Sequence, residues 1–114
     1  MDQQIAKSDG IILSLAEHNG AYTAAFKNAF DWLSRIESKT WRNKPMLLLS
    51  TSPGVRGGKS VMAMALDRFP FHDGNIVFSM SFPSFNENFK KDEVVNPELK
   101  AQLNEGVRLL EASI

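Results

Sequence analysis

Three short apolar runs, separated by longer amphipathic segments, constrain the fold of this 114-residue chain more than any other feature. The runs are Ile11–Leu15, Met46–Ser50 and Asn75–Met80. Each has the length and apolar content of a buried strand, and we expect the first to be buried on both faces. Between them, residues 21–35 and 60–69 place apolar side chains at helical spacing. Alternating buried strands and helices predict parallel β-α-β units in a three-layer α/β arrangement.

The two ends of the chain add helices to this pattern. Gln3–Ser8 has the character of the end of a helix, and Ser84–Val95 is expected to be an irregular surface excursion. Asn96 and Pro97 suit the N-cap and first position of a last helix. Within that helix Gly106 indicates close packing. The stripe expected to face the core is Leu99, Leu103, Val107, Leu110 and Ile114.

Composition excludes several classes of function. Thirteen Lys and Arg balance thirteen Asp and Glu, so the chain lacks the basic surplus typical of proteins that bind nucleic acid or anionic membranes. It has no cysteine, which excludes disulfides and thiolate chemistry. No apolar run is long enough to cross a bilayer, and the start lacks a basic signal-peptide region. We therefore expect a single cytoplasmic domain spanning residues 1–114.

Two loops that follow predicted strands carry unusual residues, and ligands of parallel sheets bind at such loops. The segment Thr51–Gly58 contains Gly54, Gly57 and Gly58, whose backbone could approach a ligand closely and offer it amide groups. Its spacing matches neither a Walker loop nor a dinucleotide fingerprint. A plain strand-to-helix turn is the alternative interpretation.

The other loop contains Glu17, His18 and Asn19, a combination that suggests acid–base catalysis or metal binding. Residue type alone favours a simpler interpretation, in which Glu17 is solvated or lies at a helix N-terminus and Asn19 caps or turns the chain. The chain has only two histidines and no recurring ligand spacing, so we expect no metal site. No Ser-His-Asp arrangement can be argued either, because Ser52 lacks a nucleophile-elbow context.

Aromatic residues offer further candidates for a binding surface. Trp32 and Trp41 could cover a ligand or a subunit contact, although packing against the core is the favoured interpretation. Phe82 and Phe85 bracket Pro83 and Ser84 in a predicted loop and could line a pocket.

Two segments resemble signatures of a known family, the NADPH-dependent FMN reductases. Residues 17–22 (E-H-N-G-A-Y) and 26–35 (F-K-N-A-F-D-W-L-S-R) are similar to the family's P-E-Y-N-G-S-Y…L-K-N-A-[IL]-D-W-L-S-R segment. Residues 51–58 (T-S-P-G-V-R-G-G) resemble its T-S-P-G-x-x-G-G signature. The resemblance runs from Ile5 to the end of the chain. It implies a flavodoxin-like fold, bound FMN, NAD(P)H as electron donor, and acceptors such as quinones, azo compounds, free flavin or metal oxyanions.

The resemblance also implies which residues contact the flavin, while the flavin itself performs the hydride transfer and no side chain is catalytic. The implied cofactor-binding residues are Glu17, His18, Asn19, Gly20, Thr51, Ser52, Gly54, Arg56 and Gly57. The chain departs from the family pattern at Ala16, Thr23 and Ala24, where Pro, Pro and often Gly are usual. It also has His18 in place of a tyrosine, which keeps a planar ring.

Family members begin with a strand, a phosphate-binding loop, a helix and a second strand, none of which has a counterpart here. The resemblance therefore implies an incomplete flavodoxin-like sheet of about three strands, truncated at the N-terminus, with weak FMN binding. A non-catalytic remnant that associates with itself or with a fuller homologue is the alternative function, and an unrelated α/β binding module is a third. Without its neighbours, Ile11–Leu15 becomes an apolar sheet edge, which predicts a homodimer or higher oligomer.

Overall fold

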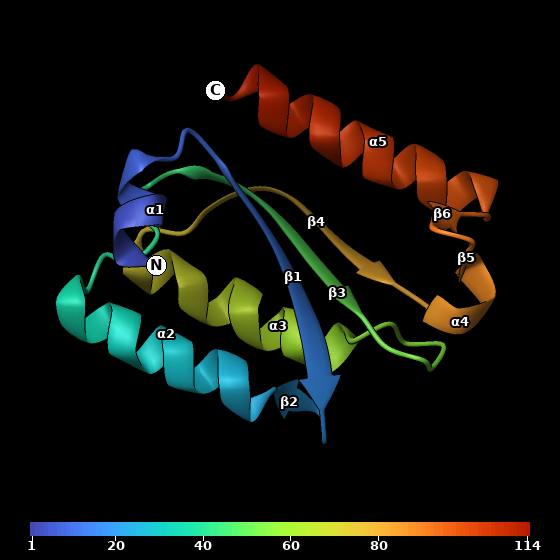
Figure 1. The fold of residues 1–114 in the computed structure, drawn as a ribbon, viewed down its shortest axis with the longest axis horizontal. Coiled ribbons are helices and arrows are strands. Elements are labelled where there is room, and N and C mark those ends of the chain that lie inside the picture. The colour runs from blue at the N-terminus through green and yellow to red at the C-terminus, as the bar shows by residue number, and fades with distance from the viewer.

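The computed structural model describes all residues from Met1 to Ile114 and contains a mostly parallel sheet between two layers of helices (Figure 1). In chain order the elements are α1 (Asp2–Lys7), β1 (Ile11–His18), β2 (Ala21–Tyr22), α2 (Ala24–Ile36), β3 (Pro45–Thr51), α3 (Lys59–Arg68), the 3-10 helix η1 (Phe69–His72), β4 (Asn75–Phe82), α4 (Phe85–Asn88), β5 (Phe89–Lys90), β6 (Glu93–Val94) and α5 (Pro97–Ala112). The central sheet has the order β2-β1-β3-β4. Its three long strands β1, β3 and β4 are parallel, so the predicted α/β architecture is confirmed.

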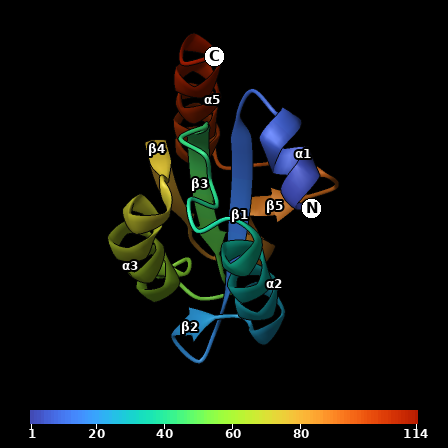
Figure 2. The ribbon, with the colours of Figure 1, turned by 90° about the vertical axis from the view of Figure 1, so that its left-hand side faces the viewer.

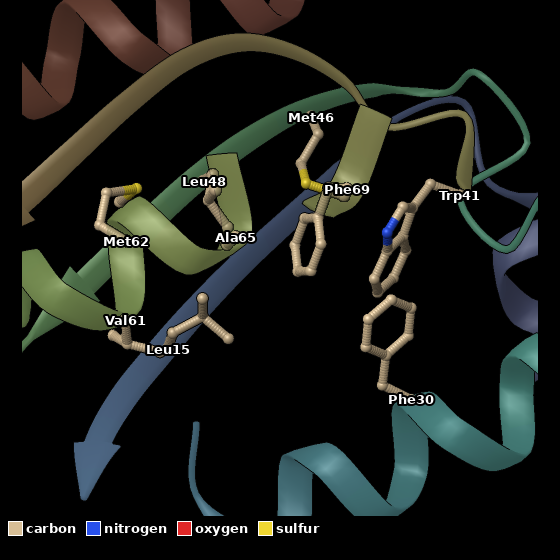
Figure 3. Close-up of a cluster of buried hydrophobic side chains, with 9 residues drawn as sticks. All are labelled: Leu15, Phe30, Trp41, Met46, Leu48, Val61, Met62, Ala65 and Phe69. Carbon is tan, nitrogen blue, oxygen red and sulfur yellow. The ribbon is translucent and has the colours of Figure 1, made fainter. Parts of the chain in front are cut away.

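The helices lie on both faces of the sheet, with α2 and α3 on one side and α5 on the other (Figure 2). Between the sheet and the α2–α3 layer lies the larger core cluster, which Figure 3 shows. Its members are Leu15, Phe30, Trp41, Met46, Leu48, Val61, Met62, Ala65 and Phe69. A smaller cluster of Met80, Phe82 and Leu99 forms on the α5 side. Trp41 is therefore a core residue, as favoured above, whereas Trp32 on α2 is 67% exposed.

Strand β1 differs from its expected burial. Strand β3 is buried on both faces, but β1 alternates, with Ile11, Leu13 and Leu15 toward the α2–α3 layer and Ile12 61% exposed on the other side. The prediction that β1 is buried on both faces is wrong, because α5 packs mainly over β3 and β4. No strand pairs with the outer edge of β1 before Glu17, so the edge position predicted for this run is confirmed.

Helix α2 begins later than the periodicity predicts. Residues Ala21 and Tyr22 form β2 and pair antiparallel with His18 and Glu17. The helix follows from Ala24, after the hydroxyl of Thr23 accepts a hydrogen bond from the backbone N–H of Phe26 at 3.1 Å. The Asn19–Gly20 turn therefore closes a hairpin before the helix begins.

The N-cap and the glycine of the last helix follow the prediction, but Ile114 does not belong to the core-facing stripe, because it lies beyond the end of α5 and is 66% exposed. The side chain of Asn96 accepts hydrogen bonds from the backbone N–H groups of Glu98 and Leu99, which makes it the N-cap of α5. Gly106 is buried, and a Cβ there would lie 2.7 Å from Cδ1 of Phe78 and 2.9 Å from Cδ1 of Leu47. Close packing of α5 on the sheet thus explains this glycine.

The segment expected to be irregular contains regular elements. Residues 85–88 form the short helix α4, and the two-residue strands β5 and β6 pair as a hairpin. Phe89, the first residue of β5, packs against the smaller core cluster. Local apolar contacts therefore order a stretch whose polar composition suggested a loop. No helix is both long and apolar enough to span a membrane.

Candidate functional site

The two loops singled out in the sequence meet at the carboxyl ends of β1 and β3. The parallel register places Ala16 opposite Thr51, so the residues that follow each strand lie side by side. A pocket of about 350 Å³ forms between them. Its lining comprises Ala16, Glu17, His18, Thr51, Ser52, Pro53 and Phe85. Four of the nine predicted cofactor-binding residues thus line one pocket.

Glu17 joins the β1 side of this pocket to helix α3. Its Oε1 accepts a hydrogen bond of 2.7 Å from the backbone N–H of Val61, in the first turn of α3. The N-cap of α3 is Gly58, which has no side chain to satisfy that N–H. A carboxylate also interacts favourably with the positive end of a helix. The placement of Glu17 at a helix N-terminus is therefore confirmed, although the helix is α3 and not the one that follows Glu17 in the chain.

His18, Asn19 and Gly20 end β1 in a tight hairpin turn. Asn19 and Gly20 have φ values of 52° and 77°, the left-handed geometry that a two-residue type I′ turn requires. His18 is exposed and lines the pocket. Asn19 and Gly20 are exposed at the turn and do not contribute to the lining. The turn fixes the direction of β1 at the pocket edge.

The glycine pair packs against the protein's own backbone. Gly57 has a φ of 60°, and a Cβ on it would lie 2.6 Å from the carbonyl carbon of Phe82. Gly58 has a φ of 80° and lies close to Ser50, whose hydroxyl donates to the carbonyl of Gly57 at 2.8 Å. Gly57 thus closely approaches the end of β4, and Gly58 closely approaches the end of β3.

The outer part of this loop is open to solvent. Gly54 is exposed, and a Cβ there would meet only the hydroxyl of Ser52, at 3.8 Å. Its carbonyl accepts a 2.8 Å hydrogen bond from the backbone N–H of Ser84, which ties the loop to the end of β4. Arg56 is exposed and its guanidinium lies 3.3 Å from the hydroxyl of Ser60. Gly54, Arg56 and Gly57 therefore shape the loop without lining the pocket.

Phe85 is a pocket residue that the family resemblance did not supply. Its position next to Pro83 and Ser84 did predict that it could line a pocket, and the structure confirms this for both Phe82 and Phe85. The backbone N–H of Phe85 donates to the carbonyl of Ser52 at 3.1 Å. This bond brings the aromatic ring to the glycine-rich loop.

Comparison with known proteins identifies the family of this chain. The profile of the family described as NADPH-dependent FMN reductase matches residues 1–88. These include every residue that lines the pocket at the ends of β1 and β3. The chain belongs to the NADPH-dependent FMN reductase family. The helix α5 lies outside the matched region.

Two curated relatives that match part of the chain are named as quinone reductases. A quinone reductase of Escherichia coli K12 is 39% identical over 56 residues, which is 49% of this chain and 30% of that protein. An NADPH:quinone oxidoreductase of Arabidopsis thaliana is 40% identical over 58 residues, 51% of this chain and 29% of the relative. The matched segment of this chain thus covers less than a third of the length of either relative.

A solved structure shares the fold. FerB, a flavoenzyme NAD(P)H:(acceptor) oxidoreductase from Paracoccus denitrificans, superposes with a TM-score of 0.72 at 26% sequence identity. The superposition covers 98% of this chain and 64% of FerB. The flavodoxin-like arrangement expected from the family resemblance is therefore confirmed.

Proposed function

We propose that the pocket at the ends of β1 and β3 holds the isoalloxazine ring of FMN in an NAD(P)H-dependent oxidoreductase. The observation that carries this proposal is the convergence of both signature segments, at Glu17–His18 and Thr51–Ser52, on one pocket. Its volume of about 350 Å³ lies within the ~300–1,000 Å³ typical of small-molecule sites. FMN would supply hydride transfer from NAD(P)H to acceptors of the quinone, azo or flavin type.

The chain's own residues would bind and orient the ring. The imidazole of His18 offers a flat surface at one wall, and the Phe85 ring offers a second. Glu17 acts as a positioning residue, because its bond to Val61 holds the N-terminus of α3 against β1. Thr51 and Ser52 would add backbone and hydroxyl contacts from the pocket wall. Asn19, Gly20, Gly54, Arg56 and Gly57 would contribute through the shape of the two loops, since they do not line the pocket.

The chemistry of the lining fits the ring of the cofactor better than its phosphate. Hydroxyl, imidazole and aromatic groups and the carboxylate of Glu17 line the pocket, and no Lys or Arg does. A phosphate needs several oriented donors, either charged side chains or the free backbone N–H groups of a helix N-terminus, and here Glu17 accepts from the N-terminus of α3. We therefore expect FMN to bind weakly and with little advantage over riboflavin.

Titration by quenching of flavin fluorescence tests this proposal. Saturable binding of both flavins with similar affinity supports it, and NAD(P)H oxidation with a quinone then tests turnover separately. Absence of saturable binding of either flavin would contradict the proposed cofactor site.

A second proposal concerns assembly and the domain itself. One sheet with helices on both faces supports a single flavodoxin-like domain over residues 1–114. The unpaired edge of β1, with Ile12 61% exposed, supports self-association into a homodimer or higher oligomer. Self-association is also what the non-catalytic alternative requires, so flavin binding distinguishes the two functions.

A further inference from the structure

A second pocket, of about 180 Å³, lies on the α5 side of the sheet. Its floor comes from β1, β3 and β4, and its walls come from α4, the β5–β6 hairpin and α5. It shares Thr51 and Phe85 with the proposed flavin pocket but is otherwise lined by different residues. Seven of its ten lining residues are hydrophobic and none is charged.

Aromatic rings form one side of this second pocket. The rings of Phe85 and Phe89 stack with their centroids 5.1 Å apart and an interplanar angle of 19°. The ring of Phe82 lies 6.1 Å from that of Phe85 at 59°. Aromatic groups favour offset-stacked and tilted arrangements at such spacings. An aromatic ligand can therefore extend the existing cluster.

The polar groups in the lining leave one free hydroxyl. Ser50 donates to the carbonyl of Gly57 at 2.8 Å, and Thr51 donates to the carbonyl of Phe82 at 2.9 Å. Ser14, which projects from β1 on this side, is exposed, and its hydroxyl forms no hydrogen bond within the chain. Its hydroxyl remains available to a ligand.

Volume and charge limit what this pocket can hold. An apolar protein cavity of about 150 Å³ is large enough for one benzene molecule. A pocket of about 180 Å³ thus suits one six-membered ring with a small substituent, whereas the three fused rings of a flavin need more space. A charged ligand would lose its hydration without gaining a charged partner.

We propose that this second pocket binds a single uncharged aromatic ring bearing one oxygen substituent, of the phenol class, with the Ser14 hydroxyl hydrogen-bonded to that oxygen. The apolar side chains of Met80 on the floor and of Val94 and Leu103 on the walls would cover the ring. This inference does not depend on flavin binding at the neighbouring pocket.

The test is an NMR titration of the flavin-free protein with phenol and, separately, with benzene. Wild-type protein should bind both saturably, with residues of the second pocket showing the largest shifts. Ser14→Ala should weaken phenol binding about two- to ten-fold, the effect of losing one hydrogen bond, and leave benzene binding unchanged. An equal loss for both ligands would contradict the role of Ser14.

A matched pair of variants tests the location. Val94 lines the pocket, whereas its neighbour Val95 does not and is 42% exposed. Val94→Phe should fill the space and abolish binding of both ligands, while Val95→Phe should bind them as the wild type does. Circular dichroism checks that each variant is folded. If Val94→Phe does not fold, Leu103→Phe replaces it as the pocket-filling variant. The proposal is overturned if wild-type protein shows no saturable phenol binding, or if a folded pocket-filling variant retains it.

Discussion

The carboxylate of Glu17, at the end of β1, accepts a 2.7 Å hydrogen bond from the backbone N–H of Val61, in the first turn of α3. The two residues are far apart in the chain, and their contact joins the end of β1, which lines the proposed flavin pocket, to the helix that follows the 51–58 loop. Because the N-cap Gly58 has no side chain, Glu17 supplies the capping group that α3 otherwise lacks.

Removal of the Glu17 carboxylate should therefore destabilise the fold. Glu17→Ala is expected to lower the free energy of unfolding by about 1 kcal/mol, as the loss of a helix cap does. Glu17→Gln keeps an acceptor oxygen and should cost less. Urea unfolding measures both, with Glu111→Ala on the exposed surface of α5 as the control. Equal stabilities of the Glu17→Ala and Glu111→Ala variants would contradict the capping role.

Substitution by alanine should affect protein stability differently at Gly54 and at Gly57 of the 51–58 loop. Gly57→Ala places a Cβ 2.6 Å from the carbonyl carbon of Phe82 at a positive φ, and should cost on the order of 2–4 kcal/mol. Gly54→Ala meets only Ser52, so its effect should stay within about 0.5 kcal/mol. Chemical denaturation measures the free energy of unfolding of both variants. A Gly57→Ala variant as stable as the wild type would show that the loop does not pack against β4 as described.

Ionisation of Tyr22 should lower the free energy of unfolding in alkaline solution. Burial raises the pKa of Tyr22 above its usual value of 10.0, so the unfolded chain loses this proton at lower pH than the folded protein. The contribution of Tyr22 is therefore fully present below pH 10 and is lost as pH rises through the folded-state pKa. Tyr22 is the only tyrosine, so tyrosinate absorbance reports it directly, and Tyr22→Phe should flatten the alkaline decline.

The same substitution has an expected effect at neutral pH. The Tyr22 hydroxyl is buried without a hydrogen-bond partner, so Tyr22→Phe should leave stability unchanged or raise it by up to about 1 kcal/mol. Ser50→Ala is the contrasting case, because the Ser50 hydroxyl is buried and bonded to Gly57 and Ser81. That change should cost about 1–3 kcal/mol, and a loss of similar size in Tyr22→Phe would refute the unpartnered hydroxyl.

The open edge of β1 leads to a prediction about assembly. Light scattering should report a homodimer or larger species for the unmodified chain, and Ile12→Lys should yield monomers or insoluble protein, since a charge on an edge strand blocks pairing. Ile36→Lys, on the equally exposed surface of α2, should leave the assembly intact. A stable monomer for the unmodified chain would contradict association through this edge.

Elements whose signals are local were predictable from the sequence. The N-cap of α5 followed from Asn96 and Pro97, and the three long strands followed from their apolar runs. The burial of β1 was not predictable, because it depends on which helices cover each face of the sheet. The start of α2 was placed too early, since Tyr22 continues the helical periodicity while its backbone belongs to the hairpin.

In the candidate site, too, some features were predictable from the sequence and others were not. That the loops after β1 and β3 would meet follows from the parallel order of the strands, so the grouping of His18 with Thr51 was expected. The contact of Gly57 with Phe82 and that of Glu17 with Val61 join residues distant in sequence, and no local pattern encodes them.

Blocking the pocket tests the proposed flavin site most directly. Ala16 lines this pocket, and a large ring at that position would fill the space at the carboxyl ends of β1 and β3. Riboflavin titration of Ala16→Trp should show at least a ten-fold loss of affinity relative to the wild type, while Ala101→Trp, on the exposed surface of α5, should bind normally. If folded Ala16→Trp binds riboflavin as tightly as the wild-type chain, the flavin site does not lie in this pocket.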